Sequence, residues 1–276
     1  MIVRQTPGGD VVLIRQADHA DLAAQFAAHF GNESFAAPTP FETMVRATTY
    51  HDHHFGDIEA KLPIDPLQGR PYGHRDMPFA QSHLDAIAAN ISWLLLDDPY
   101  SGLLVSMHHS GLPQNRYGLV KSWQTRGGAG AKPRTIRPEV ASSIGSLEKD
   151  QLSLVKRLTD AGRATDKEIQ TNYRLLQFFD LLSLYLCCDG YQDGKLVPTK
   201  IGPVPMDYGG RDCQEIHVEP QSESHIRLAP YPFDVSQLRV SVSARLIQPC
   251  PSSSPENCRA AVMKAGREYF SWTLIP

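Results

Sequence analysis

Apolar residues spaced three and four positions apart along most of the first 190 residues predict a series of amphipathic helices. The expected helices cover about 18–31, 39–57, 79–96, 98–109, 146–161 and 165–188. Two of these helices begin with a capping box, in which a threonine is followed three residues later by glutamate: Thr39 with Glu42, and Thr165 with Glu168. The pattern therefore indicates a mainly helical core.

Segments rich in β-branched residues lie at both ends of the chain. Residues 2–6 and 11–15 flank a Pro-Gly-Gly-Asp turn and predict a hairpin, and 225–228, 238–247 and 269–275 predict strands. The expected fold class is mostly α with a small β part (α+β). We expect one domain over 1–276, with a helical core at about 17–190 and a small antiparallel sheet from about 1–16 and 225–276.

Several of the predicted helices turn a histidine or an aspartate toward the core. These residues, which continue the apolar stripes, are His19, His51, Asp52, His83, His108, His109 and Asp180. Asp180 lies between Phe179 and Leu181, and an ionised carboxylate in such surroundings costs several kcal/mol unless it is paired. A single buried histidine or aspartate usually has a private partner. So many of them together indicate one shared divalent cation.

Composition narrows the setting. The chain has 276 residues and a formal net charge of −3, which gives no general attraction to nucleic acid or to anionic membranes. No apolar run reaches the roughly 18 residues of a membrane span, and the start of the chain lacks the apolar stretch of a signal peptide. The five cysteines include no CxxC pair and do not indicate a disulfide framework. We therefore expect a cytoplasmic, bacterial protein.

The order His19, then His51-Asp52, then Asp180, with each part on its own helix, resembles the HD-domain superfamily. The wider sequence is similar to an uncharacterised bacterial family, domain of unknown function 3891. That similarity covers almost the whole chain, including Gln16–Ala20, Asp98–His108 and Asp180–Cys187.

The resemblance implies an HD-like helical core and metal-dependent hydrolysis of a phosphate ester. On this hypothesis His19, His51, Asp52 and Asp180 hold a first metal, and Asp52 bridges to a second one at His83 and His108. Asp52 and His109 are then the catalytic residues, with His109, His53 or His54 moving the proton. Imidazole and carboxylate ligands favour Fe, Mn, Ni or Zn, as one or two ions. Many two-metal members have Gly-Lys after the His-Asp pair, whereas this chain has His53-His54.

Two other functions stay open from the sequence. A minority branch of the superfamily uses two irons for oxygenation, and a non-catalytic metal- or ligand-binding domain could keep the same core. The oxygenase predicts iron without turnover of phosphate esters, and the binding domain predicts no chemistry at all.

The segment 110–138 follows the predicted ligands and contains six basic residues and no acidic residue before Glu139. Arg116, Lys121 and Arg126 are candidates for binding an anionic small-molecule substrate. The segment is either a lid over the site or a solvated loop. Nothing in the sequence resembles a module that reads duplex nucleic acid. The oligomeric state is not predicted.

Overall fold

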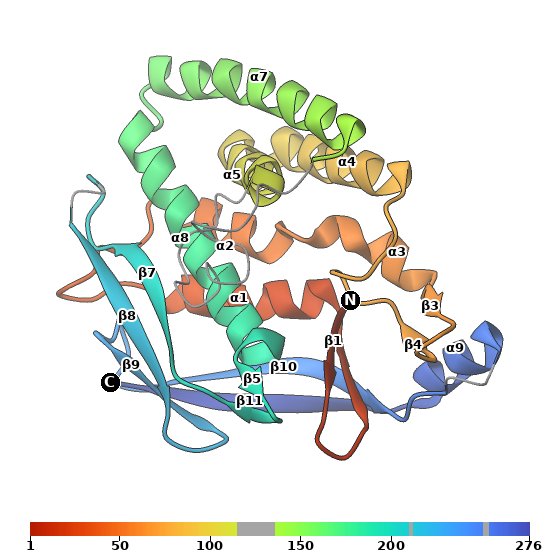
Figure 1. The fold of residues 1–276 in the computed structure, drawn as a ribbon. Coiled ribbons are helices and arrows are strands. Elements are labelled where there is room, and N and C mark those ends of the chain that lie inside the picture. Colours follow the sequence, from red (N-terminus) through yellow and green to blue (C-terminus); the bar gives the residue numbers. More distant parts are fainter. Residues whose placement is uncertain (115–135, 210–211, 251–253) are drawn as a thin grey trace.

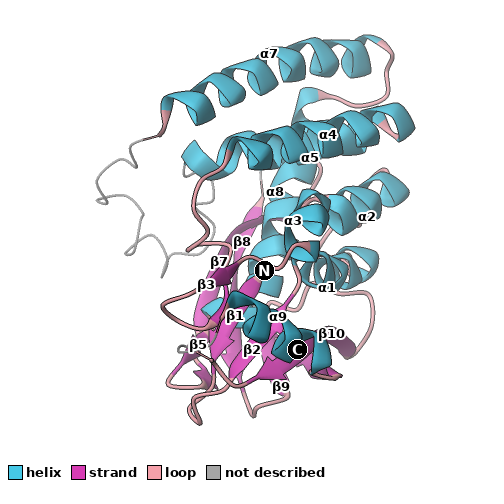
Figure 2. Cartoon of the chain, turned by 90° about the vertical axis from the view of Figure 1, so that its right-hand side faces the viewer, coloured by secondary structure: helices cyan, strands magenta, loops and turns pink. Residues whose placement is uncertain are grey.

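Helices and strands form two layers in the computed structural model, which describes residues 1–114, 136–209, 212–250 and 254–276 (Figures 1 and 2). The α-helices are α1 (Gln16–His29), α2 (Phe41–Tyr50), α3 (Gly56–Ala60), α4 (Gln81–Asp97), α5 (Pro99–Gly111), α7 (Pro138–Asp160), α8 (Asp166–Leu184) and α9 (Pro255–Lys264). Short 3-10 turns occupy His53–Phe55 and Leu112–Gln114, and a π-helical turn at Tyr185–Asp189 continues α8.

The main sheet has seven strands in the order β1-β2-β10-β11-β9-β8-β7. These strands are β1 (Ile2–Gln5), β2 (Val11–Ile14), β7 (Thr199–Pro205), β8 (Cys213–Pro220), β9 (His225–Ala229), β10 (Leu238–Ile247) and β11 (Arg267–Ile275). Two small ribbons add β3 (Ile64–Asp65) with β4 (Arg70–Pro71), and β5 (Tyr191–Gln192) with β6 (Lys195–Leu196).

The α+β class is confirmed, but the expected sheet was too small and of the wrong type. The N-terminal hairpin does pair with a C-terminal strand, because Leu13 of β2 lies opposite Arg245 of β10. However, β11 pairs with β9 in parallel, so the sheet is mixed. The strands β7 and β8 were also missed. The register shifts between Ile201 and Val204, around the pair Gly202-Pro203, and such a break hides the alternation of a strand.

The boundaries of the helices show which local signals were reliable. The capping box at Thr165 and Glu168 is confirmed, and both of its hydrogen bonds are present. The box expected at Thr39 is wrong, since Pro40 is the N-cap of α2 and no side chain caps that helix. The helix α7 begins at Pro138, eight residues earlier than expected, because proline at the first helical position starts it.

The core lies where α1 and α8 pack on the sheet (Figure 1). Aromatic rings join the two helices: the Phe30 ring centroid lies 5.9 Å from that of Phe178 and 5.4 Å from that of Phe179. Burying each of these side chains stabilises the folded state by about 1.5–3 kcal/mol, because its apolar surface leaves water. Because α1 and α8 are fixed to the sheet and to each other, polar residues on their inner faces have defined positions.

The helices α2 and α5 cover α1 and α8, and α4 and α7 lie outside them (Figure 1). Gly102 lets α5 approach α4 closely, because a Cβ there would come 2.7 Å from Leu95 Cδ2. This contact sets the position of α5, whose last turns carry His108 and His109. Among the described residues, no helix combines the length and the apolarity needed to cross a membrane.

Candidate metal centre

Five of the predicted metal ligands meet inside the helical layer. His19 lies on α1, His51 and Asp52 directly follow α2, His108 lies on α5, and Asp180 lies on α8. All five are buried, with at most 6% of any residue exposed. Burial of this kind is rare for aspartate unless a partner compensates its charge. The structure thus brings these residues together, and coordination of a metal remains a prediction.

The end of α2 explains how two consecutive residues face one point. Neighbouring residues in a helix point about 100° apart. The helix stops at Tyr50, and Asp52 has φ −111° and ψ 17°, outside the helical region. A 3-10 turn at His53–Phe55 follows. The continuous helix expected as far as residue 57 is therefore wrong, and its interruption places the carboxylate of Asp52 beside the ring of His51.

The Nε2 atoms of His19 and His51 lie at ligand spacing from each other and from an oxygen of either aspartate. The Nε2 atoms of His19 and His51 are 3.2 Å apart, and Asp180 Oδ1 lies 3.3 Å from each of them. Asp52 Oδ2 lies 3.5 Å from His19 Nε2 and 3.8 Å from His51 Nε2. Donors about 2.1 Å from a metal in tetrahedral geometry are separated by about 3.4 Å. The arrangement therefore has the dimensions of a metal site.

Hydrogen bonds around the cluster orient both imidazoles. His51 Nδ1 lies 2.7 Å from the carbonyl oxygen of Thr48, which can only accept, so Nδ1 carries the proton. The Ser183 hydroxyl donates to the Asp180 carbonyl and accepts from His19 Nδ1, both at 2.7 Å. Each Nε2 atom then carries a lone pair, and the two lone pairs face each other. Only a cation or an added proton between the two Nε2 atoms makes this approach favourable.

The carboxylate of Asp52 is held in the same way. The side-chain amide of Gln16, at the start of α1, donates to Asp52 Oδ2 over 3.0 Å. The backbone N–H of Gln16 donates to Glu59 Oε1 over 3.0 Å. Gln16 is therefore an anchored group that orients Asp52. Sequence reasoning missed both Gln16 and Ser183, although Ser183 lies one helical turn after Asp180 and shares its face.

The charges of the cluster balance only if it contains two protons or one divalent cation. Burial disfavours the protonated form of His19, but hydrogen bonds to Asp180 and Asp52 outweigh burial and raise its pKa to about 9. The same carboxylates raise the pKa of His51. Burial opposes ionisation of Asp180 and Asp52, yet the neighbouring imidazoles hold both pKa values well below the usual range. A divalent ion neutralises both carboxylates and leaves the imidazoles neutral.

A second set of donors overlaps the first. One ligand atom each from Asp52, His54 and His109 lies within 4.8 Å of the others, and all three residues are buried. His109 Nε2 donates to the carbonyl of His51 over 2.9 Å, which leaves Nδ1 with a lone pair. His54 Nδ1 is buried, and none of the residues that the structure describes offers it a hydrogen bond. Asp52 belongs to both sets, so the two groups share this carboxylate.

The donor set fits a transition metal. The groups able to hold an ion among the described residues consist of histidine and aspartate only, a combination that suits Fe, Mn, Ni or Zn. Cys187 is nearby in sequence, but burial raises the pKa of its thiol and keeps it protonated. His108 forms a third overlapping group with His51 and Asp180, and its Nε2 lies 3.9 Å from Asp52 Oδ1.

The structure does not bring every predicted residue to this centre. His83, expected to hold a second metal, lies half-buried near the start of α4 and belongs to none of the metal-capable groups. His54 takes the place that was expected for His83, in the group with Asp52 and His109. The 3-10 turn after Asp52 directs the His54 side chain inward. His53 is exposed and contacts the Trp93 ring at a centroid distance of 5.7 Å. Arg116, Lys121 and Arg126 lie outside the described residues.

Comparison with known proteins gives one result. No curated protein and no solved structure matches the chain. The family model described as "Protein of unknown function (DUF3891)" matches residues 1–249, which include every residue of the candidate centre. The chain therefore belongs to the family Protein of unknown function (DUF3891).

Proposed function

We propose that this protein is a metal-dependent phosphohydrolase that acts on a phosphate-bearing small molecule. The observation that carries the proposal is the buried cluster of two aspartates and several histidines at the spacing of metal ligands. The order of these residues along the chain, His19, His51-Asp52 and Asp180, is that of the HD-domain superfamily. That order supports hydrolysis of a phosphate ester over other metal chemistry.

The residues have separate tasks on this proposal. A bound divalent metal would lower the pKa of a water molecule to about 7 and neutralise charge on the phosphoryl group. His19, His51, Asp52 and Asp180 hold the ion, and Gln16 and Ser183 keep the ligands oriented. The positions of Asp52, His54 and His109 are suited to a second ion or to proton transfer.

His109 is the proposed proton-transfer residue. Burial lowers its pKa to about 4, so the imidazole is neutral at pH 7. Its Nε2–H is occupied by the His51 carbonyl, and the lone pair at Nδ1 is the part of the ring able to accept a proton. Neutral His109 would therefore accept the proton that the attacking water loses and then pass it to the leaving oxygen, so that the proton is conserved.

Elemental analysis of the untagged protein tests the proposal. We expect at least one transition-metal ion per chain in the wild type, and loss of that ion in Asp180→Asn. Asp160→Asn is the matched control, because Asp160 is an exposed aspartate that pairs only with Lys156 at the end of α7. The control should keep its metal.

Activity assays on the metal-loaded protein complete the test. We expect hydrolysis of at least one class of phosphomonoester, nucleotide or phosphodiester with Mn, Fe, Ni or Zn, and none with Asp180→Asn. Protein that contains no metal and is not destabilised by chelators contradicts the proposal. Iron with a mixed-valent magnetic signal and no phosphatase activity supports a two-iron oxygenase instead. Metal-dependent stability without turnover supports a binding domain.

A further inference from the structure

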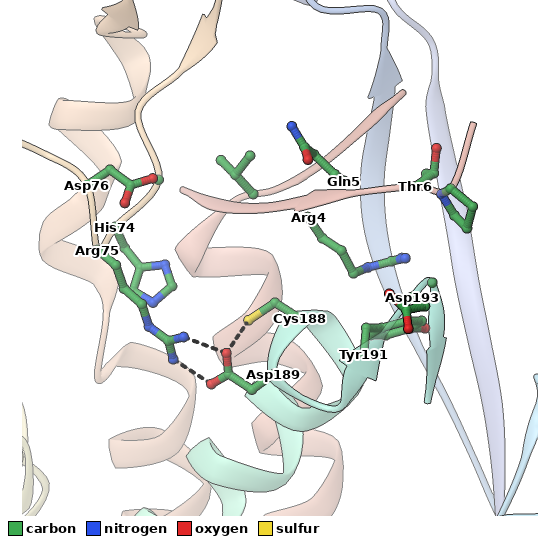
Figure 3. Close-up of a pocket in the computed structure, with 14 residues that line it drawn as sticks. Arg4, Gln5, Thr6, His74, Arg75, Asp76, Cys188, Asp189, Tyr191 and Asp193 are labelled. Carbon is green, nitrogen blue, oxygen red and sulfur yellow. Dashed lines mark hydrogen bonds and ion pairs between the residues drawn. The ribbon is translucent and has the colours of Figure 1, made fainter. Parts of the chain in front are cut away.

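A pocket lies between β1, the loop after β4 and the π-helical turn that follows α8 (Figure 3). Its volume is about 550 Å³, within the range of roughly 300–1,000 Å³ common for small-molecule sites. Polar groups on its wall include Arg4, Thr6, His74, Tyr191 and Asp193. None of these residues belongs to the metal cluster.

His74 is a buried histidine of the pocket wall that feels the charge of Asp52. Its ring lines the pocket, and its backbone N–H donates to the Met1 carbonyl over 2.7 Å, which fixes the loop to β1. Burial and the charge of Arg75 lower the pKa of His74 to about 4, while the nearby Asp52 carboxylate acts in the opposite direction. His74 Nδ1 is buried and has no hydrogen-bond partner within the described part of the chain. The ring is therefore a neutral group on the pocket wall, within electrostatic reach of Asp52.

Most of the charges on the wall are already paired. Asp189 accepts two hydrogen bonds from Arg75, at 2.6 and 2.5 Å, as Figure 3 shows. Asp76 lies 3.4 Å from Arg70. Of the charged side chains that line the pocket, Arg4 and Asp193 have no ion-pair partner among the described residues. The chemistry of the pocket therefore depends on one cation and one anion.

The guanidinium of Arg4 is fixed and still has free donors. Its Nε donates to the Cys187 carbonyl over 3.1 Å, and its central carbon lies 3.9 Å from the centroid of the Tyr191 ring. Neither Nη has an acceptor among the described residues, and the side chain is half-buried. A guanidinium held in this way is suited to bind the oxygens of a phosphate.

We propose that this pocket binds a hydroxylated phosphomonoester, with Arg4 holding the phosphate and Asp193 and Thr6 receiving the hydroxyl groups. The carboxylate of Asp193 weakens the binding of a bare polyanion, because it repels a second negative group. The wall of the same pocket also carries His74. This proposal rests on the proposed hydrolase function, to which it adds the class of substrate.

Calorimetric titration of the metal-loaded full chain with glycerol 3-phosphate tests the site. We expect binding in the wild type, weakened by at least about tenfold in Arg4→Gln, since a charge-assisted hydrogen bond is lost. Arg239→Gln is the control, because Arg239 is an exposed arginine on β10, and it should bind like the wild type. Inorganic phosphate and glycerate should both bind more weakly than glycerol 3-phosphate. Equal binding by Arg4→Gln, or tighter binding of glycerate, overturns the proposal.

Two further measurements keep the test independent of folding and of the proposed function. Arg4→Lys keeps the cation over Tyr191 but loses the planar donors, so its affinity should lie between those of the wild type and Arg4→Gln. In a crystal soaked with tungstate, anomalous density should appear at Arg4. Density only at the histidine cluster overturns the pocket proposal and leaves the hydrolase proposal standing. Absence of metal in the purified protein defeats the hydrolase proposal, while binding that depends on Arg4 still supports the pocket.

Discussion

The hydroxyl of Ser183 has a defined role that a single substitution can isolate. It accepts the Nδ1–H of His19 and donates to the Asp180 carbonyl, so it holds the His19 lone pair at Nε2, toward the candidate metal site. Ser183→Ala removes the acceptor. The ring can then rotate or change tautomer, and its buried N–H is left without a partner.

The expected magnitude follows from this geometry. Loss of a partner that orients a metal-binding histidine typically costs about 10–100-fold in affinity, or about 1.4–2.7 kcal/mol. The unsatisfied N–H costs a further ~1–3 kcal/mol in the metal-free protein. Metal affinity is measured by competition with a chromophoric chelator, and stability by denaturant unfolding after metal removal.

Ser101→Ala is the matched control. Ser101 is also fully buried, and its hydroxyl donates to the Asp98 carbonyl over 2.9 Å on α5, away from the cluster. This variant should lose stability but bind metal like the wild type. If Ser183→Ala stays folded and its affinity remains within twofold of the wild type, the argument from the tautomer of His19 is refuted.

Three further predictions follow from the cluster and from the packing around it. If free metal is at a hundredfold excess over its Kd for the wild type, removing the metal with a chelator should lower the free energy of unfolding by about 2.7 kcal/mol. Asp180→Asn should show no chelator effect in the same unfolding assay. Metal uptake should release protons, because the raised pKa of His19, about 9, means that the metal-free cluster is protonated at pH 7. Apparent affinity should therefore rise with pH up to about 9, and equal binding heats in buffers of different ionisation enthalpy at pH 7 would contradict this. Gly102→Ala should destabilise the fold by about 1–3 kcal/mol in thermal unfolding, because its Cβ meets Leu95. Gly145 on α7 has open space around it, so Gly145→Ala should be neutral or stabilising. A similar loss of stability in both variants would rule out the packing explanation.

Local patterns alone identified the parts of the protein that depend on neighbours in the sequence. Helical periodicity placed His19, His108 and Asp180 on inward faces, because residues three and four apart lie on one side of a helix wherever that helix packs. The Thr165 capping box likewise involves residues within one turn. The α+β class followed from the same local signals.

Tertiary structure decided which of these inward faces meet. His83 has the helical phase expected of a ligand, yet α4 lies outside α2 and α5, and His83 belongs to none of the groups of described residues able to hold an ion. His54 points inward because α2 ends before Asp52, and periodicity cannot show such a break. The pairing of β7, β8 and β9 into one mixed sheet, and the distances of 3.2–3.5 Å among the closest donor pairs of the cluster, also depend on residues far apart in the chain. A sequence pattern reports burial along one element, whereas convergence on an ion is set by how several elements pack.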